Sequence, residues 1–251
     1  MRRVNPIGHP FIELGEVDSS NNYAMRQIQA QLSDHGTTYF ADFQTQGKGQ
    51  RGKIWNAEPG QNIMMSCVLK PFFLTIDNQF ALNVSIALAC CDFFNFHSAG
   101  NTRIKWPNDI YWEDRKAGGI LIENVLQGKD WKFSVAGIGI NINQTFFSPD
   151  IANPVSLKQI AGKNFDPVSL AKQLCTFLQH RWEMLAKGND YSWIDEYNGN
   201  LYKKGEKVIF KKNNTVFPAI IKGVNLRGEL MIDTGTDISA IPFGEVEWMI
   251  R

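Results

Sequence analysis

The chain has 251 residues, of which 43% are hydrophobic and 20% are charged, and its formal net charge is +1. This length accommodates one large domain, or a large domain followed by a small one. The composition is typical of a folded globular protein and excludes extensive disorder. Because the net charge is close to zero, the overall balance attracts neither nucleic acid nor an anionic membrane, so any anion site is built locally.

The N-terminus, MRRVNPIGHPFIELG, is too polar and too rich in proline to serve as the apolar core of a secretory signal. The longest apolar run, around 84–91, is much shorter than a bilayer span. The four cysteines stand in apolar segments without a CxxC pair: Cys67, Cys90, Cys91 and Cys175. We therefore expect a cytoplasmic protein with reduced core thiols, without disulfides, a zinc site or a membrane partner.

Helix and strand signals alternate through the first 198 residues. The N-cap formers at 18–21 predict a helix over 23–32, and Asp77 is expected to cap a long helix that ends near Phe96. Further helices are predicted at 155–161, at 167–185 with proline in the first turn, and at 190–197. Strands are predicted at 37–45, 62–69, 104–105, 110–112, 116–125 and 132–142, the last two forming a hairpin.

The pattern changes at about Gly199. Short strands are predicted at close spacing, at 206–210, 217–222, 229–233 and 238–242, separated by turn residues. The sequence therefore predicts an α+β chain of two domains, a larger domain of helices and strands at 1–198 and a small all-β barrel at 199–251.

The segment GKGQRGKIW, residues 47–55, combines three glycines with three cations. Glycines let backbone N–H groups converge on an anion, and the cations supply charge. The segment is neither a Walker A loop nor a GxGxxG turn before a helix, since the following WNAEP disfavours helix. Taken alone, this segment is as consistent with an exposed connecting loop as with an anion-binding loop.

Two further segments combine glycine with polar residues. KWPNDIYWEDRKAGGILIE (105–123) places Lys116 before Gly118 and Gly119, where a ligand can approach the backbone closely. GIGININ (137–143) offers Asn141, whose amide can pair with a purine edge. Taken singly, the two segments are better explained by a solvated hairpin lysine and an ordinary turn than by a binding site.

In combination, these motifs resemble the biotin–protein ligase family across essentially the entire chain. The order of DSSN, Gln44 with the glycine-basic loop ending in Trp55, KWPND, RKAGG and GIGIN carries the resemblance. It implies a domain related to class II aminoacyl-tRNA synthetases, followed by a small β-barrel. It also implies that biotin and ATP, with Mg²⁺, give biotinyl-5′-AMP, and that a lysine of a biotin carboxyl carrier protein then receives the biotin.

The resemblance also assigns site residues. It implies catalytic roles for Lys116, Arg51 and Asp109, with Asp109 orienting the incoming amine. Biotin would be lined by Ser19, Ser20, Gln44, Gly47, Lys48, Gly119 and Gly137. The adenylate would be bound by Gly49, Gln50, Arg51, Gly52, Trp55, Asn108, Lys116 and Asn141, with Trp55 as an apolar lid. No metal ligands are assigned.

One residue departs from the family pattern, in which the loop commonly reads GRGRxGR. Gln50 stands where the second arginine is usual, and it has no charge. The departure predicts either weaker retention of the adenylate or compensation by Arg51, and we expect compensation. Fewer than 20 residues precede Ser19, too few for a DNA-binding fold, so no DNA partner is expected.

Two alternatives differ in function class. A lipoate or octanoate ligase of the same fold would carry an arginine-rich RRxSGGG segment, which this sequence lacks. A non-catalytic biotin-binding regulator has no need of Lys116 or the lid. A homodimer is left open.

Overall fold

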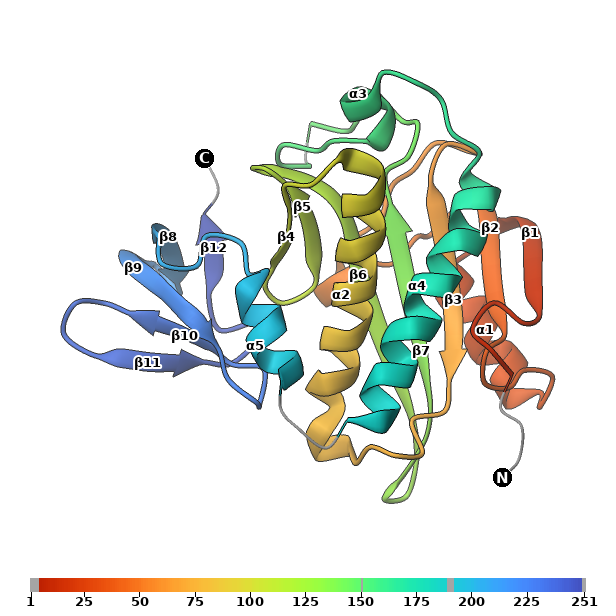
Figure 1. Cartoon of the computed structure of the whole chain (residues 1–251), viewed down its shortest axis with the longest axis horizontal. Coiled ribbons are helices and arrows are strands. Elements are labelled where there is room, and N and C mark those ends of the chain that lie inside the picture. The colour runs from red at the N-terminus through yellow and green to blue at the C-terminus, as the bar shows by residue number, and fades with distance from the viewer. Residues whose placement is uncertain (1–4, 150, 189–191, 250–251) are drawn as a thin grey trace.

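The computed structural model describes residues 5–149, 151–188 and 192–249, which contain two β-sheets (Figure 1). The first sheet has seven strands in the spatial order β1-β2-β3-β7-β6-β5-β4. They are β1 (Phe11–Val17), β2 (Thr38–Gln44), β3 (Ile63–Leu69), β4 (Thr102–Lys105), β5 (Asp109–Trp112), β6 (Arg115–Gln127) and β7 (Asp130–Ile140). Only β1 and β2 pair in parallel, so the sheet is mixed, as the α+β prediction requires.

Helices cover both faces of this sheet. They are α1 (Ser20–Gln29), α2 (Gln79–Ser98), α3 (Leu157–Ala161), α4 (Pro167–Lys187) and α5 (Ser192–Gly199). In Figure 1, α2 and α4 pass in front of the sheet and pack against each other. α1 instead packs on β2, β3 and β7 around a separate apolar cluster that includes Ala24, Tyr39 and Val135. This leaves the N-terminus of α1 beside the sheet face that α2 and α4 do not cover.

Capping residues set the helix starts. α1 begins three residues before the predicted start, because Ser19 is its extended N-cap. The prediction that Asp77 caps α2 was wrong: Asp77 lies in a short 3₁₀ turn (Ile76–Asn78), and Asn78 is the N-cap. α4 begins with Pro167, as predicted, and Asp166 accepts from the Val168 and Ser169 backbone N–H groups.

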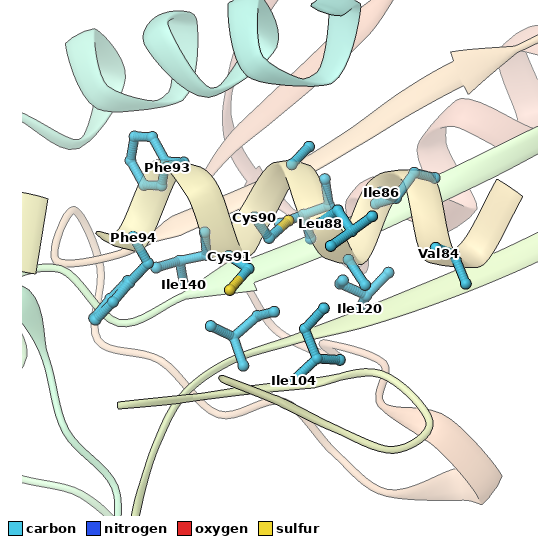
Figure 2. Close-up of a cluster of buried hydrophobic side chains, with 14 of the residues drawn as sticks. Val84, Ile86, Leu88, Cys90, Cys91, Phe93, Phe94, Ile104, Ile120 and Ile140 are labelled. Carbon is cyan, nitrogen blue, oxygen red and sulfur yellow. The ribbon is translucent and has the colours of Figure 1, made fainter. Parts of the chain in front are cut away.

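α2 is the central helix of the core (Figure 2). Its side chains pack between α4 and the sheet, where they meet residues such as Ile104, Ile120 and Ile140. The stretch Ile76–Ser98 is long and apolar enough to span a bilayer by composition, but 67% of the relevant window is buried within the protein. This burial is what a core helix requires. Cys90 and Cys91 on α2, like Cys67 and Cys175, are buried free thiols.

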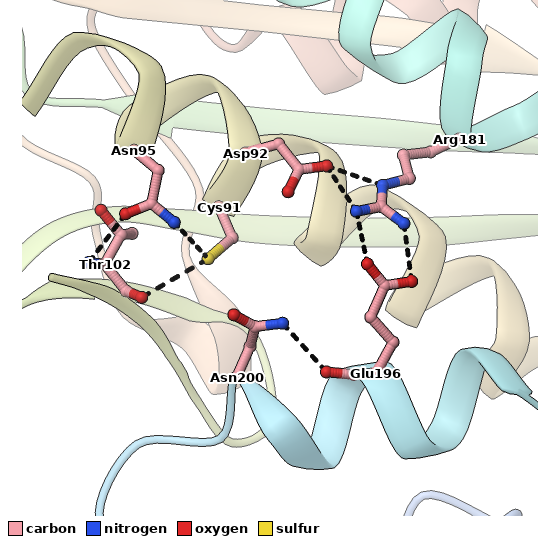
Figure 3. Close-up of polar contacts among 7 residues, drawn as sticks. All are labelled: Cys91, Asp92, Asn95, Thr102, Arg181, Glu196 and Asn200. Carbon is pink, nitrogen blue, oxygen red and sulfur yellow. Dashed lines mark hydrogen bonds and ion pairs between the residues drawn. The ribbon is translucent and has the colours of Figure 1, made fainter. Parts of the chain in front are cut away.

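An ion-pair cluster joins α2, α4 and α5 (Figure 3). Arg181 on α4 donates to Asp92 on α2 at 2.7 Å and makes two 2.7 Å hydrogen bonds to Glu196 on α5. The Arg181 side chain is only 12% exposed, so both carboxylates are needed to compensate its lost hydration. The cluster fixes α5, from which the chain enters the second sheet.

The second sheet contains five antiparallel strands in the order β11-β10-β9-β8-β12. They are β8 (Lys207–Lys212), β9 (Thr215–Val224), β10 (Leu230–Asp233), β11 (Ile238–Ile241) and β12 (Glu247–Met249). Four of them match the strands predicted after Gly199. β12 was not predicted, and neither was β1 in the first sheet. Of the helix predicted at 190–197, residues 190 and 191 lie outside the described residues.

Candidate active site

Two glycines on adjacent strands form the floor of the candidate site. Gly119 on β6 and Gly139 on β7 are register partners, and the Trp55 indole lies over both. A Cβ on Gly139 would stand 2.5 Å from the indole Cε2, and a Cβ on Gly119 would stand 3.5 Å from its Cζ3. Only glycine at position 139 lets the ring approach the sheet this closely. The indole N–H is buried and has no acceptor in the described part of the chain, so a ligand acceptor would satisfy it.

The charged end of the site is an ion pair next to this floor. Lys116 Nζ lies 2.7 Å from Asp109 Oδ1, and the side chains are 26% and 21% exposed. A β-bulge brings the two together, because Ala117 is an extra residue between the pairs Ile110–Gly118 and Tyr111–Lys116. A Cβ on Gly119 would stand 3.3 Å from Asp109 Oδ1, so the carboxylate also needs glycine beneath it.

Two buried asparagines support the charged end. Asn141 donates to the carbonyl of Lys116 at 3.3 Å and to that of Val155 at 3.1 Å. The Asn108 amide donates to the Ile120 carbonyl, and the Ile120 N–H donates back to the Asn108 carbonyl at 3.0 Å. In this structure both side-chain amide nitrogens are bound to backbone, so their predicted contacts with the adenylate stay predictions.

A cluster of buried polar side chains, which we call the polar pocket, lies beneath the N-terminus of α1. Gln44 Oε1 accepts from the Ser20 backbone N–H at 2.6 Å, and Ser66 Oγ on β3 donates to Ser20 Oγ at 2.7 Å. Ser66 Oγ is also 2.6 Å from Asn21 Oδ1. Ser19, Ser20, Asn21 and Ser66 are all buried. Such a set of neutral donors and acceptors suits a neutral polar group rather than an ion.

Asn21 connects this pocket to the sheet and to the glycine-basic loop. Its Oδ1 lies so close above Gly137 that no Cβ would fit there, so the contact that the structure shows for Gly137 is with Asn21. Its Nδ2 donates to Glu123 Oε2 at 2.7 Å. Glu123 Oε1 in turn accepts from Lys48 Nζ at 3.2 Å. The loop is therefore tied to the polar pocket through one carboxylate.

The glycine-basic loop is a small hydrogen-bonded hairpin. Trp55 N–H donates to the Gly47 carbonyl at 2.8 Å, Gly49 N–H donates to the Lys53 carbonyl at 2.7 Å, and Lys48 pairs with Ile54. A Cβ on Gly47 would collide with the Trp55 carbonyl, so the closure requires glycine. The predicted adenylate residues Gln50, Arg51 and Gly52 form a 3₁₀ turn at the tip, and none of the three is buried.

Residues of the second sheet and its turns border one side of the site, which the sequence did not predict. The Arg51 guanidinium lies against Gly244, where a Cβ would be 3.4 Å from Cζ. The Trp106 ring packs edge-on against Phe243, with centroids 5.8 Å apart, and its Nε1 donates to the Gly228 carbonyl at 2.8 Å. The turn between β11 and β12 therefore borders the loop and the KWPND turn.

Three side chains of this site were not assigned from the sequence: Asn21, Ser66 and Glu123. Asn21 had a signal as part of DSSN but was interpreted only as a capping residue, and Glu123 ends the 105–123 motif. Ser66 had none, because a serine within the apolar run 62–69 is identified only by what it faces.

A metal ion bound by the protein alone needs several ligating side chains close together. Among the described residues, no group of three or more His, Cys, Asp or Glu side chains could hold one. Asp109 is already engaged by Lys116. We therefore assign no protein-borne magnesium site.

Comparisons with known proteins identify the family of the chain. The family profile "Biotin/lipoate A/B protein ligase family" matches residues 14–141. The chain is 26% identical to "Bifunctional ligase/repressor BirA" of Escherichia coli, over 92% of this chain and 71% of that protein. It is 27% identical to "Biotin--[acetyl-CoA-carboxylase] ligase" of Paracoccus denitrificans, over 93% and 98% of the two chains.

Among solved structures, the chain resembles the biotin protein ligase from Aquifex aeolicus in complex with biotin and ATP. The TM-score is 0.79 at 25% identity, with 95% of this chain and 97% of that chain covered. The match therefore includes both sheets. The family profile covers half of the chain and includes the glycine-basic loop, the Asp109–Lys116 pair and both floor glycines. The chain belongs to the biotin/lipoate A/B protein ligase family.

Proposed function

We propose that the chain is a biotin–protein ligase. It joins biotin to ATP, giving biotinyl-5′-AMP and pyrophosphate, and then transfers biotin to a lysine of a biotin carboxyl carrier protein. The observation that carries the proposal is the junction of two unlike subsites. The polar pocket at Ser20 and Gln44 is connected by the β6–β7 strand pair to the charged end, where Lys116 and the Trp55 indole both lie next to Gly119.

The neutral pocket suits the ureido group of biotin. A ureido group has two N–H donors and one carbonyl acceptor. Each neutral hydrogen bond contributes only about 1 kcal/mol, so tight binding needs a partner in place for all three groups. Ser20, Gln44 and Asn21 supply hydroxyl and amide groups of both kinds in a buried setting. The acidic end of biotin then extends along the sheet toward the charged end.

At the charged end, Lys116 offsets the repulsion between two anions, the biotin carboxylate and the α-phosphate. The carboxylate oxygen attacks the α-phosphorus, the bond from that phosphorus to the bridging oxygen breaks, and its electron pair leaves on pyrophosphate. Positioning and electrostatic stabilisation are sufficient for such a step, and no enzyme nucleophile is needed. Trp55 covers the reacting group and excludes water, which would hydrolyse the anhydride.

In the second half-reaction the amine of the carrier lysine attacks the biotinyl carbonyl, and the C–O bond to AMP breaks. Asp109 lies next to Lys116 and accepts a hydrogen bond from the incoming amine, which orients it. Magnesium enters with ATP as part of the nucleotide substrate. We further propose that the protein acts in the cytoplasm, where its buried thiols stay reduced.

The test is release of pyrophosphate from ATP by the purified chain, with biotin, with lipoate or with no acid. We expect release that depends on biotin, and ATP-dependent transfer of labelled biotin to an added carrier domain. Release with lipoate alone indicates a lipoate or octanoate ligase instead. Tight biotin binding without any release indicates a non-catalytic regulator.

A further inference from the structure

Lys105 holds its ammonium group between the two sheets, next to the charged end of the site. It lies on β4 as the register partner of Asp109 on β5. Its Nζ is 5.6 Å from the ring centroid of Tyr111 and 5.1 Å from that of Trp248 on β12. Tyr202 packs beside both rings, at 4.9 and 5.6 Å between centroids. The lysine is thus held by aromatic faces, which attract a cation without neutralising it.

The charge of Lys105 is not balanced by a carboxylate. Within the described ranges, no Asp or Glu lies within ion-pair distance of its Nζ, and Asp109 is bound by Lys116 at 2.7 Å. Burial lowers the pKa of Lys105, attraction by Asp109 opposes this, and repulsion by Lys116 and Lys53 adds to it. Asp109, the acidic group that acts on Lys105, is thus already paired with Lys116. A partly buried cation in this position is stabilised when an anion binds.

The anion follows from the chemistry of the site, and the inference rests on the proposed function. Lys116 serves the carboxylate and the α-phosphate, whereas the negative charge that forms during adenylation leaves on pyrophosphate. We infer that Lys105 binds the β- and γ-phosphates of ATP and stabilises the departing pyrophosphate, and that Trp248 of the second sheet is its positioning residue. The second sheet thereby contributes to catalysis of one half-reaction.

Transfer from biotinyl-5′-AMP to the carrier involves no pyrophosphate, so the two half-reactions separate the roles. The experiment compares Lys105→Met, which keeps the aliphatic stem, with the wild-type chain in both. We expect biotin-dependent pyrophosphate release at subsaturating ATP to fall by about 10²-fold. Transfer of biotin from supplied biotinyl-5′-AMP to the carrier domain should stay within about twofold of wild type.

Three further variants make the test specific. Trp248→Leu removes the aromatic face and should raise the KM for ATP, whereas Trp248→Phe keeps a face and should act like wild type. Lys70→Met is the matched control, because Lys70 lies 4.9 Å over the Phe133 ring but is paired with Asp34, at the far end of β3. It should leave both half-reactions unchanged.

Equal slowing of both half-reactions by Lys105→Met would overturn the inference and leave Lys105 as a residue that only packs the two sheets together. Unchanged pyrophosphate release in that variant would overturn it as well. A wild-type chain that releases no pyrophosphate with biotin and ATP would instead contradict the proposed function itself. The two failures are therefore distinguishable.

Discussion

The polar pocket and the charged end of the site differ in burial and in how far their polar groups are already hydrogen-bonded. The polar pocket consists of buried side chains whose hydrogen bonds are closed among themselves, such as Ser66 to Ser20 and Asn21 to Glu123. The charged end has partly exposed side chains, an exposed loop tip and an indole N–H that has no acceptor among the described residues. A neutral ligand needs partners fixed in advance, since each bond contributes little. A charged ligand can bind first by electrostatic attraction and be covered by the loop afterwards. Different substitutions should therefore disable the two ends of the site.

The largest expected effect is on the charged end. Lys116→Ala should slow biotin-dependent pyrophosphate release by about 10²- to 10³-fold, because the developing charge loses its closest cation. Biotin affinity measured by calorimetry should hardly change. Lys203→Ala is the control, since Lys203 is similarly exposed at 28% and pairs with Asp114 at 3.0 Å. Loss of biotin binding in a folded Lys116→Ala protein would contradict this separation of roles.

The next effect is on the polar pocket. Asn21→Ala removes an acceptor of Ser66 and a donor to Glu123, which leaves buried polar groups unpaired at roughly 1–3 kcal/mol. Biotin should bind about 10- to 100-fold more weakly. Asn22→Ala, one residue along, removes only a bond to Asp18 and should bind biotin normally. If both variants bind equally well, the pocket is not where biotin is recognised.

A smaller effect tests compensation for Gln50. Arg51→Ala should release bound biotinyl-5′-AMP roughly 10-fold faster, because one charge-assisted hydrogen bond is lost. Adding Gln50→Arg to that variant should restore slow release, whereas Gln50→Arg alone should change little. Dissociation of labelled adenylate measures all three. Unchanged retention in Arg51→Ala would show that Arg51 does not compensate.

The smallest effect concerns the order of the loop. Trypsin can cut after Lys48, Arg51 or Lys53 at the exposed hairpin, and we expect biotinyl-5′-AMP to slow this cleavage by about 10-fold as the loop closes. Cleavage after Lys129, in the exposed β6–β7 turn, should be the same in both states and serves as the internal reference. Equal protection of the hairpin with and without adenylate would mean that it is already closed.

Most elements of the fold could be predicted because their signals are local. The start of α4 at Pro167, the β6–β7 hairpin and four strands of the second sheet follow from the first-turn proline, alternation and turn residues. β1 was not predicted: it is an edge strand whose exposed residues blur the alternation, and its parallel partner β2 lies across a helix. β12 was not predicted because a three-residue strand forms only when β8 is present to pair with it.

The site could be predicted only where motifs mark it. Lys116, Asp109 and Trp55 were named from their segments, and the structure brings them together over Gly119. The contact between Arg51 and Gly244 joins residues nearly 200 positions apart, so no local pattern could indicate it. Lys105 and Trp248 are also far apart in the sequence, so their contact could not be predicted from a local pattern either. The roles assigned to these residues stay predictions until the experiments above are done.

The contact between the Trp55 indole and Gly139 couples the lid to the floor, because the residue at position 55 decides which residue fits at position 139. A methyl group at position 139 would stand 2.5 Å from the ring, so position 139 cannot take a side chain while Trp55 is kept. A library screened for function in a Gly139→Ala background should therefore recover second-site changes to smaller residues at position 55. For engineering acceptance of a bulkier acid, these two positions are the ones to randomise together.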